Sequence, residues 1–299
     1  MKNKFSPLFL AAALLGPSAF AAEKIEVLNL DQIAIPKRWA PAESSVALDQ
    51  IKFSGHPVLK WVTQVDHFAG EPKYPVGWPR MYMTNFNKLQ PHVPSNWQDW
   101  DFFEFDVKMK LENDPLNKNC PVTFVMVGSL PIHNVPLKKL HDGKIHRVRI
   151  PIDRVNNPAK MTRFGFSMAE ANYKHGAKLT LQAGNFHLTR SSVCSIEKVK
   201  ITTPALTVID AAVKLQLQVT GPANDVARGI PFALSKVGSS RVIRKETLPV
   251  QRGEKEIEIE IDDLKLEPGD YTIELFPGDK ARSKKVSFKL LSSPYKVKK

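Results

Sequence analysis

The chain has 299 residues, a formal net charge of +13, and 15 glycines and 23 prolines. This length fits two domains, and the composition is that of folded domains with many turns, not of a disordered chain. Long amphipathic helix patterns are scarce, which favours an all-β protein. The positive charge is spread along the sequence without a recognition helix or RNA-binding motif, so nucleic acid is not the expected partner.

Residues 1–21 have the pattern of a signal peptide. Lys2 and Lys4 precede an apolar run at residues 8–15, and Ala-Phe-Ala at residues 19–21 forms a small-residue cleavage site. The apolar run is shorter than the roughly 20 residues that a bilayer span requires. We therefore expect an exported protein, secreted or periplasmic, without a membrane span.

Residues 22–198 form the first predicted domain, and its strongest strand pattern lies at residues 96–110. There Phe103 and Phe105 alternate with Glu104 and Asp106, which predicts a strand with one apolar and one charged face. Further strands are expected at residues 25–30, 58–65, 121–129 and 145–152, with a single helical turn within 153–160.

Residues 164–190 are expected to form two short strands joined by a polar loop. Phe164, Phe166 and Met168 alternate with small or polar residues, and a second alternating run at 179–188 is interrupted by a turn-like break at Gly184 and Asn185. The loop at 170–176 concentrates groups that can bind a ligand, namely those of Glu170, Asn172, Tyr173, Lys174 and His175.

The best domain boundary lies at residues 195–204, because every tryptophan and every histidine precedes it. The second domain, residues 204–292, has the pattern of a small antiparallel sandwich. Pro268, Gly269 and Asp270 mark a turn within it. Strands are expected at residues 214–220, 230–237, 240–247, 256–261, 266–275 and 285–291, followed by a basic tail at 293–299 that we expect to fray.

The first domain resembles the galactose-binding-like jelly-roll domains. The similarity rests on residues 97–109, 146–155, 173–176 and 186–190, and it covers roughly residues 50–190. The second domain resembles the immunoglobulin- or fibronectin-like sandwiches, chiefly through residues 266–275. The resemblance implies a jelly-roll β-sandwich followed by a smaller sandwich. It also implies the role of a non-catalytic carbohydrate-binding module or accessory domain.

Two features stay open at the level of sequence. Modules of this kind often carry a structural calcium ion, but no extended Asp-rich loop gives its site here, and no other cofactor is expected. Cys120 and Cys194 are the only cysteines. Export permits a disulfide between them, although two buried thiols would give the same sequence.

Trp78 and Tyr82 are the best candidates for rings that stack on sugars, and Arg80 between them could pair with a carboxylate or sulfate. Trp97 is a further candidate. Glu170, Asn172, Tyr173 and His175 would supply the polar half of the site. The structural alternatives are that Trp78 covers the core under a loop, that Trp97 or Trp100 packs inward, and that Tyr173 packs on the sheet.

No enzyme is expected, because the sequence lacks a nucleophile elbow, a zinc-protease motif, a phosphate loop and a marked pair of carboxylates. The expected function is exported, non-catalytic recognition of a polysaccharide, with the basic charge favouring an acidic glycan. One alternative is a structural or protein-interaction component of the cell envelope, with the second domain contacting a protein partner. A small polysaccharide-active enzyme using Tyr173 and His175 in the manner of a lyase is a further alternative.

Overall fold

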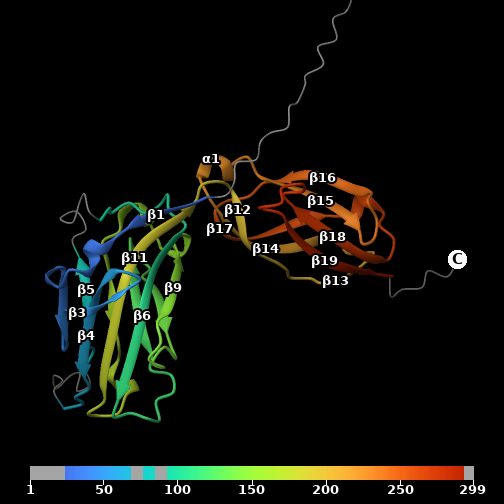
Figure 1. Ribbon diagram of the computed structural model, residues 1–299. Helices are drawn as coiled ribbons and strands as arrows, with labels where there is room; N and C mark the ends of the chain where they lie inside the picture. The colour runs from blue at the N-terminus through green and yellow to red at the C-terminus, as the bar shows by residue number, and fades with distance from the viewer. Residues whose placement is uncertain (1–23, 69–76, 85–92, 293–299) are drawn as a thin grey trace, which may run out of the picture.

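The computed structural model describes residues 24–68, 77–84 and 93–292; the expected signal peptide and basic tail lie outside these ranges. The protein is all-β, as predicted, and 53% of the described residues are in strands. Figure 1 shows two β-sandwiches joined at one end of the first. None of the helices in the described ranges has the length and apolar composition to cross a membrane.

The first sandwich consists of two antiparallel sheets, which we call the β11 sheet and the β10 sheet. From β4 onward most connections cross between them, as in a jelly roll. The β11 sheet has the order β3 (Ser45–Phe53), β4 (His56–Gln64), β11 (Lys178–Ser191), β6 (Phe102–Glu112) and β9 (His146–Pro151), with β1 (Ile25–Asn29) also on β11. The β10 sheet has the order β2 (Trp39–Ala42), β5 (Arg80–Thr84), β10 (Arg163–Ser167), β7 (Val122–Val127) and β8 (His133–Leu137).

Short helical turns complete the first sandwich: η1 (Asp31–Ala34), η2 (Pro36–Arg38), η4 (Ile152–Arg154), η5 (Pro158–Lys160) and η6 (Glu170–Asn172). The core between the sheets is dominated by phenylalanine. Phe103 and Phe105 of β6 lie 5.8 and 4.8 Å from Phe124 of β7, centroid to centroid. Alternation along β6 places these rings inward, and each such pair adds about 0.5–1.5 kcal/mol to the effect of burial.

The prediction of two strands at residues 164–190 is confirmed, but the strands belong to different sheets and do not pair with each other. The chain leaves β10, crosses the end of the sandwich through η6 and enters β11. The expected break at Gly184 and Asn185 is a β-bulge inside β11. Asn185 adopts a φ of 54°, a conformation that asparagine tolerates better than most residues.

The charged face of β6 is covered, and Glu104 and Asp106 on it are only 8% and 5% exposed. They lie directly opposite Arg149 and Arg147 of β9, which cover them and form ion pairs with them. Burial raises the pKa of Glu104, but hydrogen bonds from His187 and Thr189 and the charge of Arg149 outweigh it and lower the pKa to about 2.

The change Glu104→Gln is expected to lower the free energy of unfolding at neutral pH. The pKa of Glu104 falls on folding from 4.5 to about 2, so its ionised form contributes stability above pH 4.5. That contribution declines as the pH falls from about 4.5 to about 2. Urea unfolding of both proteins at several pH values should therefore show a difference that shrinks toward pH 2. A difference independent of pH would contradict this assignment.

The second sandwich has a three-stranded sheet in the order β12 (Ser195–Ile201), β14 (Ala212–Thr220) and β17 (Gly253–Glu260). Its five-stranded sheet has the order β13 (Ala205–Thr207), β19 (Lys284–Leu291), β18 (Gly269–Leu275), β15 (Ile230–Lys236) and β16 (Val242–Leu248). Two short helices, α1 (Ala223–Val226) and η7 (Asp262–Leu264), lie in connections. Because β12 is part of this sandwich, the first sandwich ends before Ser195. The predicted boundary at residues 195–204 therefore lies too late in the chain.

Cys120 and Cys194 are both free and buried, so the disulfide alternative is wrong. Cys120 packs in the core of the first sandwich and Cys194 in the core of the second, and the two cores are separate. Burial raises the pKa of each thiol to about 11. Both side chains are therefore neutral apolar packing groups at neutral pH.

Asp101 joins the two sandwiches. Its carboxylate, at the start of β6, accepts hydrogen bonds from the backbone N–H of Ser191 at 2.8 Å and from that of Gly221 at 3.1 Å. It also pairs with the guanidinium of Arg252 at 2.8 Å, and its side chain is 3% exposed. Because Gly221 and Arg252 belong to the second sandwich, this one carboxylate binds both units and fixes them relative to each other.

The change Asp101→Ala is expected to cost about 3–5 kcal/mol, since the poorly exposed Arg252 guanidinium loses its carboxylate and two backbone N–H groups lose this acceptor. Urea unfolding measures this loss, and faster proteolysis at residues 192–194 would show that the junction has loosened. The matched control is Asp99→Ala, which removes an exposed carboxylate two residues away. Equal stability of the two variants would contradict the role of Asp101.

Candidate functional site

The candidate site lies at the end of the first sandwich that is farther from the second. Trp78 is 56% exposed there, two residues before β5 begins at Arg80. Its backbone N–H donates to a carboxylate oxygen of Glu43 at 2.6 Å, and the N–H of Gly77 donates to Glu170 at 3.0 Å. Two carboxylates thus hold the backbone that carries the exposed indole.

Gly77 is needed at this point because of a close approach. A Cβ atom at position 77 would lie 2.3 Å from a carboxylate oxygen of Glu43 and 2.7 Å from one of Glu170. Any larger residue would displace one of the two carboxylates that hold the backbone before Trp78. The local sequence Gly-Trp therefore combines space for the carboxylates with an exposed ring.

Glu170 also holds a second loop. Its other carboxylate oxygen accepts a hydrogen bond from the backbone N–H of Asp66 at 3.2 Å, and its carbonyl oxygen contacts Nε2 of His67 at 3.2 Å. With 3% of its surface exposed, Glu170 is a positioning residue and does not face solvent. The prediction that it contacts ligand is therefore wrong, although it does shape the site.

Besides the indole of Trp78, the ring of Phe68 and the imidazole of His175 face outward beside Glu170. Phe68 is 83% exposed, and its ring meets the ring of His175 edge to face at 4.8 Å. Nδ1 of His175 accepts the backbone N–H of His67 at 3.2 Å. In the neutral ring the proton is therefore on Nε2, which can donate to a ligand. We define the end-loop cluster as Glu43, Asp66, His67, Phe68, Gly77, Trp78, Glu170 and His175.

Arg80 and Tyr82 lie on the outer face of β5, next to this cluster. A guanidinium nitrogen of Arg80 donates to the carbonyl of Trp78 at 3.3 Å. The ring of Tyr82 lies close to Gly165 on the neighbouring strand, and the guanidinium of Arg163 stands 4.9 Å from its centroid. Tyr82 is thus half-buried and has one face covered by protein. Asn172 has an exposed side chain, and its carbonyl accepts a hydrogen bond from Asn117.

Tyr173 and Trp97 are corrections to the predicted site. Tyr173 is 4% exposed, and its hydroxyl donates to the carbonyl of Pro121 at 3.0 Å. Burial raises its pKa far above the usual range. Trp97 is fully buried, donates its indole N–H to Pro94, and stacks on Phe103 with centroids 5.0 Å apart. Both rings are needed by the core, which leaves neither face for a sugar.

Four residues of the cluster were not predicted from the sequence: Glu43, Asp66, His67 and Phe68. Glu43 adopts a φ of 53°, and a backbone in that region at a non-glycine residue often marks a constrained turn. The signal was weak, because these residues follow ordinary strands and lie far from position 170 in the chain. Within the described residues no group of three or more His, Cys, Asp or Glu side chains is arranged to hold a metal ion.

No family model matches the chain, and no curated protein matches it. Among solved structures, it is similar to a CBM27 module from Caldicellulosiruptor saccharolyticus in complex with mannohexaose. The identity is 11%, the TM-score 0.33, and the match covers 56% of this chain and 96% of that one.

Two further structures match more of the chain. The glycoside hydrolase domain of Endo-D from Streptococcus pneumoniae R6 matches at 9% identity and TM-score 0.29, over 84% of this chain and 37% of that one. A truncated ectodomain of the Caenorhabditis elegans fusion protein EFF-1 matches at 7% and 0.26, over 86% and 97%. At these TM-scores the likenesses assign neither a fold nor a ligand.

The change Glu170→Ala is expected to lower the free energy of unfolding by about 1–3 kcal/mol, because two backbone N–H groups lose their acceptor. Hydrogen exchange at the amides of Asp66 and Gly77 should accelerate. The matched control is Asn172→Ala on the same turn, whose side chain is exposed. If exchange at both amides were the same in the two variants, Glu170 would not hold these loops.

Proposed function

We propose that the protein is an exported, non-catalytic carbohydrate-binding or accessory protein, and that it recognises a polysaccharide through the end-loop cluster. The observation that carries the proposal is the exposed indole of Trp78 on a backbone held by two carboxylates. Sugars bind proteins through aromatic faces that cover their C–H groups and through polar groups that bind their hydroxyls. Trp78 and Phe68 supply the rings, and Glu43 and His175 the polar groups.

The charges of the cluster favour a neutral glycan. Three carboxylates, those of Glu43, Asp66 and Glu170, lie in it, and Arg80 at its edge donates to the carbonyl of Trp78. Carboxylate oxygens accept hydrogen bonds from sugar hydroxyls but repel sulfate and uronate groups. For this site we therefore replace the expectation of an acidic glycan with an uncharged one.

A non-catalytic role agrees with the positions of the titratable groups. Both oxygens of Glu170 accept backbone N–H groups. The phenol of Tyr173 donates to the Pro121 carbonyl in the core, so it does not pair with His175 as the base and acid of a lyase. General acid–base catalysis needs groups within hydrogen-bond reach of the substrate.

We propose export on the basis of the N-terminal pattern, and an immunoglobulin-like class for the second sandwich.

The alternative is a protein-interaction role in the envelope through the second sandwich. In the described part of the chain, β16 is the last strand of the five-stranded sheet. Val242 and Ile243 on this strand are 49% and 36% exposed. An edge strand with apolar residues can pair with a strand of another protein. This alternative gains support if the protein binds no glycan.

The change Trp78→Ala is expected to weaken binding of the recognised glycan by about tenfold or more, which corresponds to about 1.4 kcal/mol for the loss of one stacked ring. A glycan array probed with the mature chain identifies the ligand, and titration calorimetry with that glycan measures the loss. Because the indole is exposed, the thermal unfolding temperature should change little.

The matched control is Leu116→Ala, which removes another exposed apolar side chain of the first sandwich, 88% exposed. This control should bind like the wild type. Equal affinities of the wild type and Trp78→Ala would show that the end-loop cluster is not the glycan site, and binding to no glycan at all would exclude the proposed function.

A further inference from the structure

A second surface able to bind a ligand lies where the two sandwiches meet. Two cavities of about 180 and 380 Å³ open there, and both are lined by Phe102, Arg149 and Glu197. The two cavities therefore adjoin at these three residues, and together we call them the inter-domain groove. Its walls come from β1, β6, β9 and β11 of the first sandwich and from β12, β14, β17 and β19 of the second.

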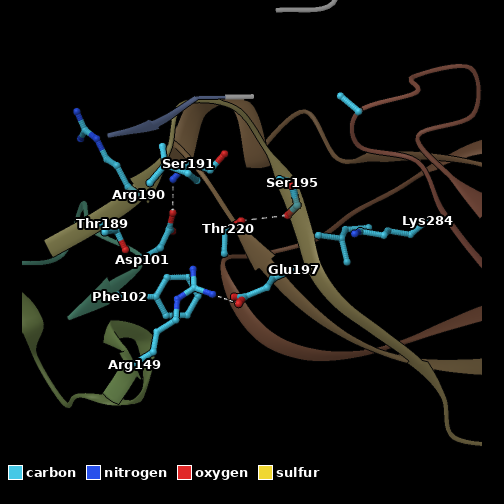
Figure 2. A pocket seen from close by; sticks show the side chains of 13 residues that line it. Asp101, Phe102, Arg149, Thr189, Arg190, Ser191, Ser195, Glu197, Thr220 and Lys284 are labelled. Atoms are coloured by element: carbon cyan, nitrogen blue, oxygen red, sulfur yellow. Dashed lines mark hydrogen bonds and ion pairs between the residues drawn. The ribbon is translucent and has the colours of Figure 1, made fainter. Parts of the chain in front are cut away.

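In the groove, Arg149 stacks on the ring of Phe102 and forms an ion pair with Glu197 (Figure 2). The guanidinium of Arg149 lies 3.6 Å from the ring centroid of Phe102 and binds Glu104 and Glu197. Since Asp101 fixes the two sandwiches a short distance away, the groove is held open before any ligand arrives. A preformed site avoids part of the entropic cost of binding.

The carboxylates of the groove already have partners. Glu197 binds Arg149, Asp101 binds Arg252, and Glu254 binds Arg154. Three lysines remain. Lys198 and Lys200 on β12 are exposed, Lys284 at the start of β19 is half-buried, and none of the three forms an ion pair with the described residues. Their uncompensated charges make the groove positive, in contrast to the end-loop cluster.

We propose that the inter-domain groove binds a segment of a polyanionic glycan, whose carboxylate or sulfate groups contact Lys198, Lys200 and Lys284. Gln218 of β14, which lines the same groove, supplies an amide for the sugar hydroxyls, whereas the amide nitrogen of the neighbouring Gln216 already donates to Glu254. This site is separate from the end-loop cluster, which lies at the opposite end of the first sandwich, and it takes a ligand of different charge.

A glycan fits this surface better than other polyanions do. The aromatic ring among the lining residues, that of Phe102, is 4% exposed and covered by Arg149. Single-stranded nucleic acid needs accessible rings on which bases stack. An acidic protein partner would need a central apolar anchor pocket. The groove instead offers lysines and amides, the groups that bind charged sugars.

The test measures binding of the full mature chain to polygalacturonate, to dextran sulfate and to uncharged dextran. The variant Lys198→Gln/Lys200→Gln/Lys284→Gln should bind one or both charged polymers about tenfold or more weakly than the wild type, because each lysine contact is worth up to about 1 kcal/mol and such contacts are screened by salt. Comparison of the two polymers tells whether carboxylate or sulfate is preferred. Dextran should not bind at the groove.

The matched control is Lys118→Gln/Lys138→Gln/Lys144→Gln, which removes the same charge from exposed positions of the first sandwich. Equal losses in the two triple variants would show that overall charge alone is responsible and would overturn the proposal. Unchanged binding in the groove variant would also overturn it, as would displacement of the charged glycan by an equal concentration of single-stranded DNA. Trp78→Ala should leave this binding unchanged, so failure of either site can be recognised separately.

Discussion

The carboxylate of Asp101 is the constraint on which the arrangement of the molecule depends. It accepts two backbone N–H groups and one guanidinium, and these three donors come from both sandwiches. A buried charge with several directional partners favours one geometry, since any rotation of the units would leave donors unpaired. The second sandwich is therefore held at a fixed angle, and the groove beside Asp101 is part of the folded structure.

The strands and the core follow from local sequence, and the partners of charged residues do not. Alternation in β6 predicted that Phe103 and Phe105 would point inward, because side chains along a strand alternate between its faces. The same rule placed Glu104 and Asp106 on the opposite face but did not predict that they are buried. Their burial depends on Arg147 and Arg149, which lie directly opposite only after β9 has paired with β6. Long-range pairing of this kind has no local sequence pattern.

The candidate site shows the same limit. A loop rich in polar residues was a valid signal of a ligand site, but the roles of neighbouring residues within it differ. Glu170 turns inward to hold two loops, Tyr173 packs in the core, and His175 faces outward. Each side chain is held by residues distant in sequence: Glu170 by Asp66 and Gly77, Tyr173 by Pro121, and His175 by His67. Trp78 and Trp97 likewise share a residue type, and only the tertiary structure separates the exposed ring from the core ring.

The two proposed sites lie at opposite ends of the same rigid strand. β11 has 14 residues and extends over roughly 45 Å at about 3.3 Å per residue, from the end-loop cluster to the junction at Ser191. A polysaccharide long enough to reach both ends would bind the second site at a high effective concentration after binding the first. The sites differ in charge, so such a polymer would need neutral and acidic stretches. The fixed junction at Asp101 keeps the distance between the sites constant. Polymers whose neutral and acidic stretches are spaced by that distance would therefore bind most tightly.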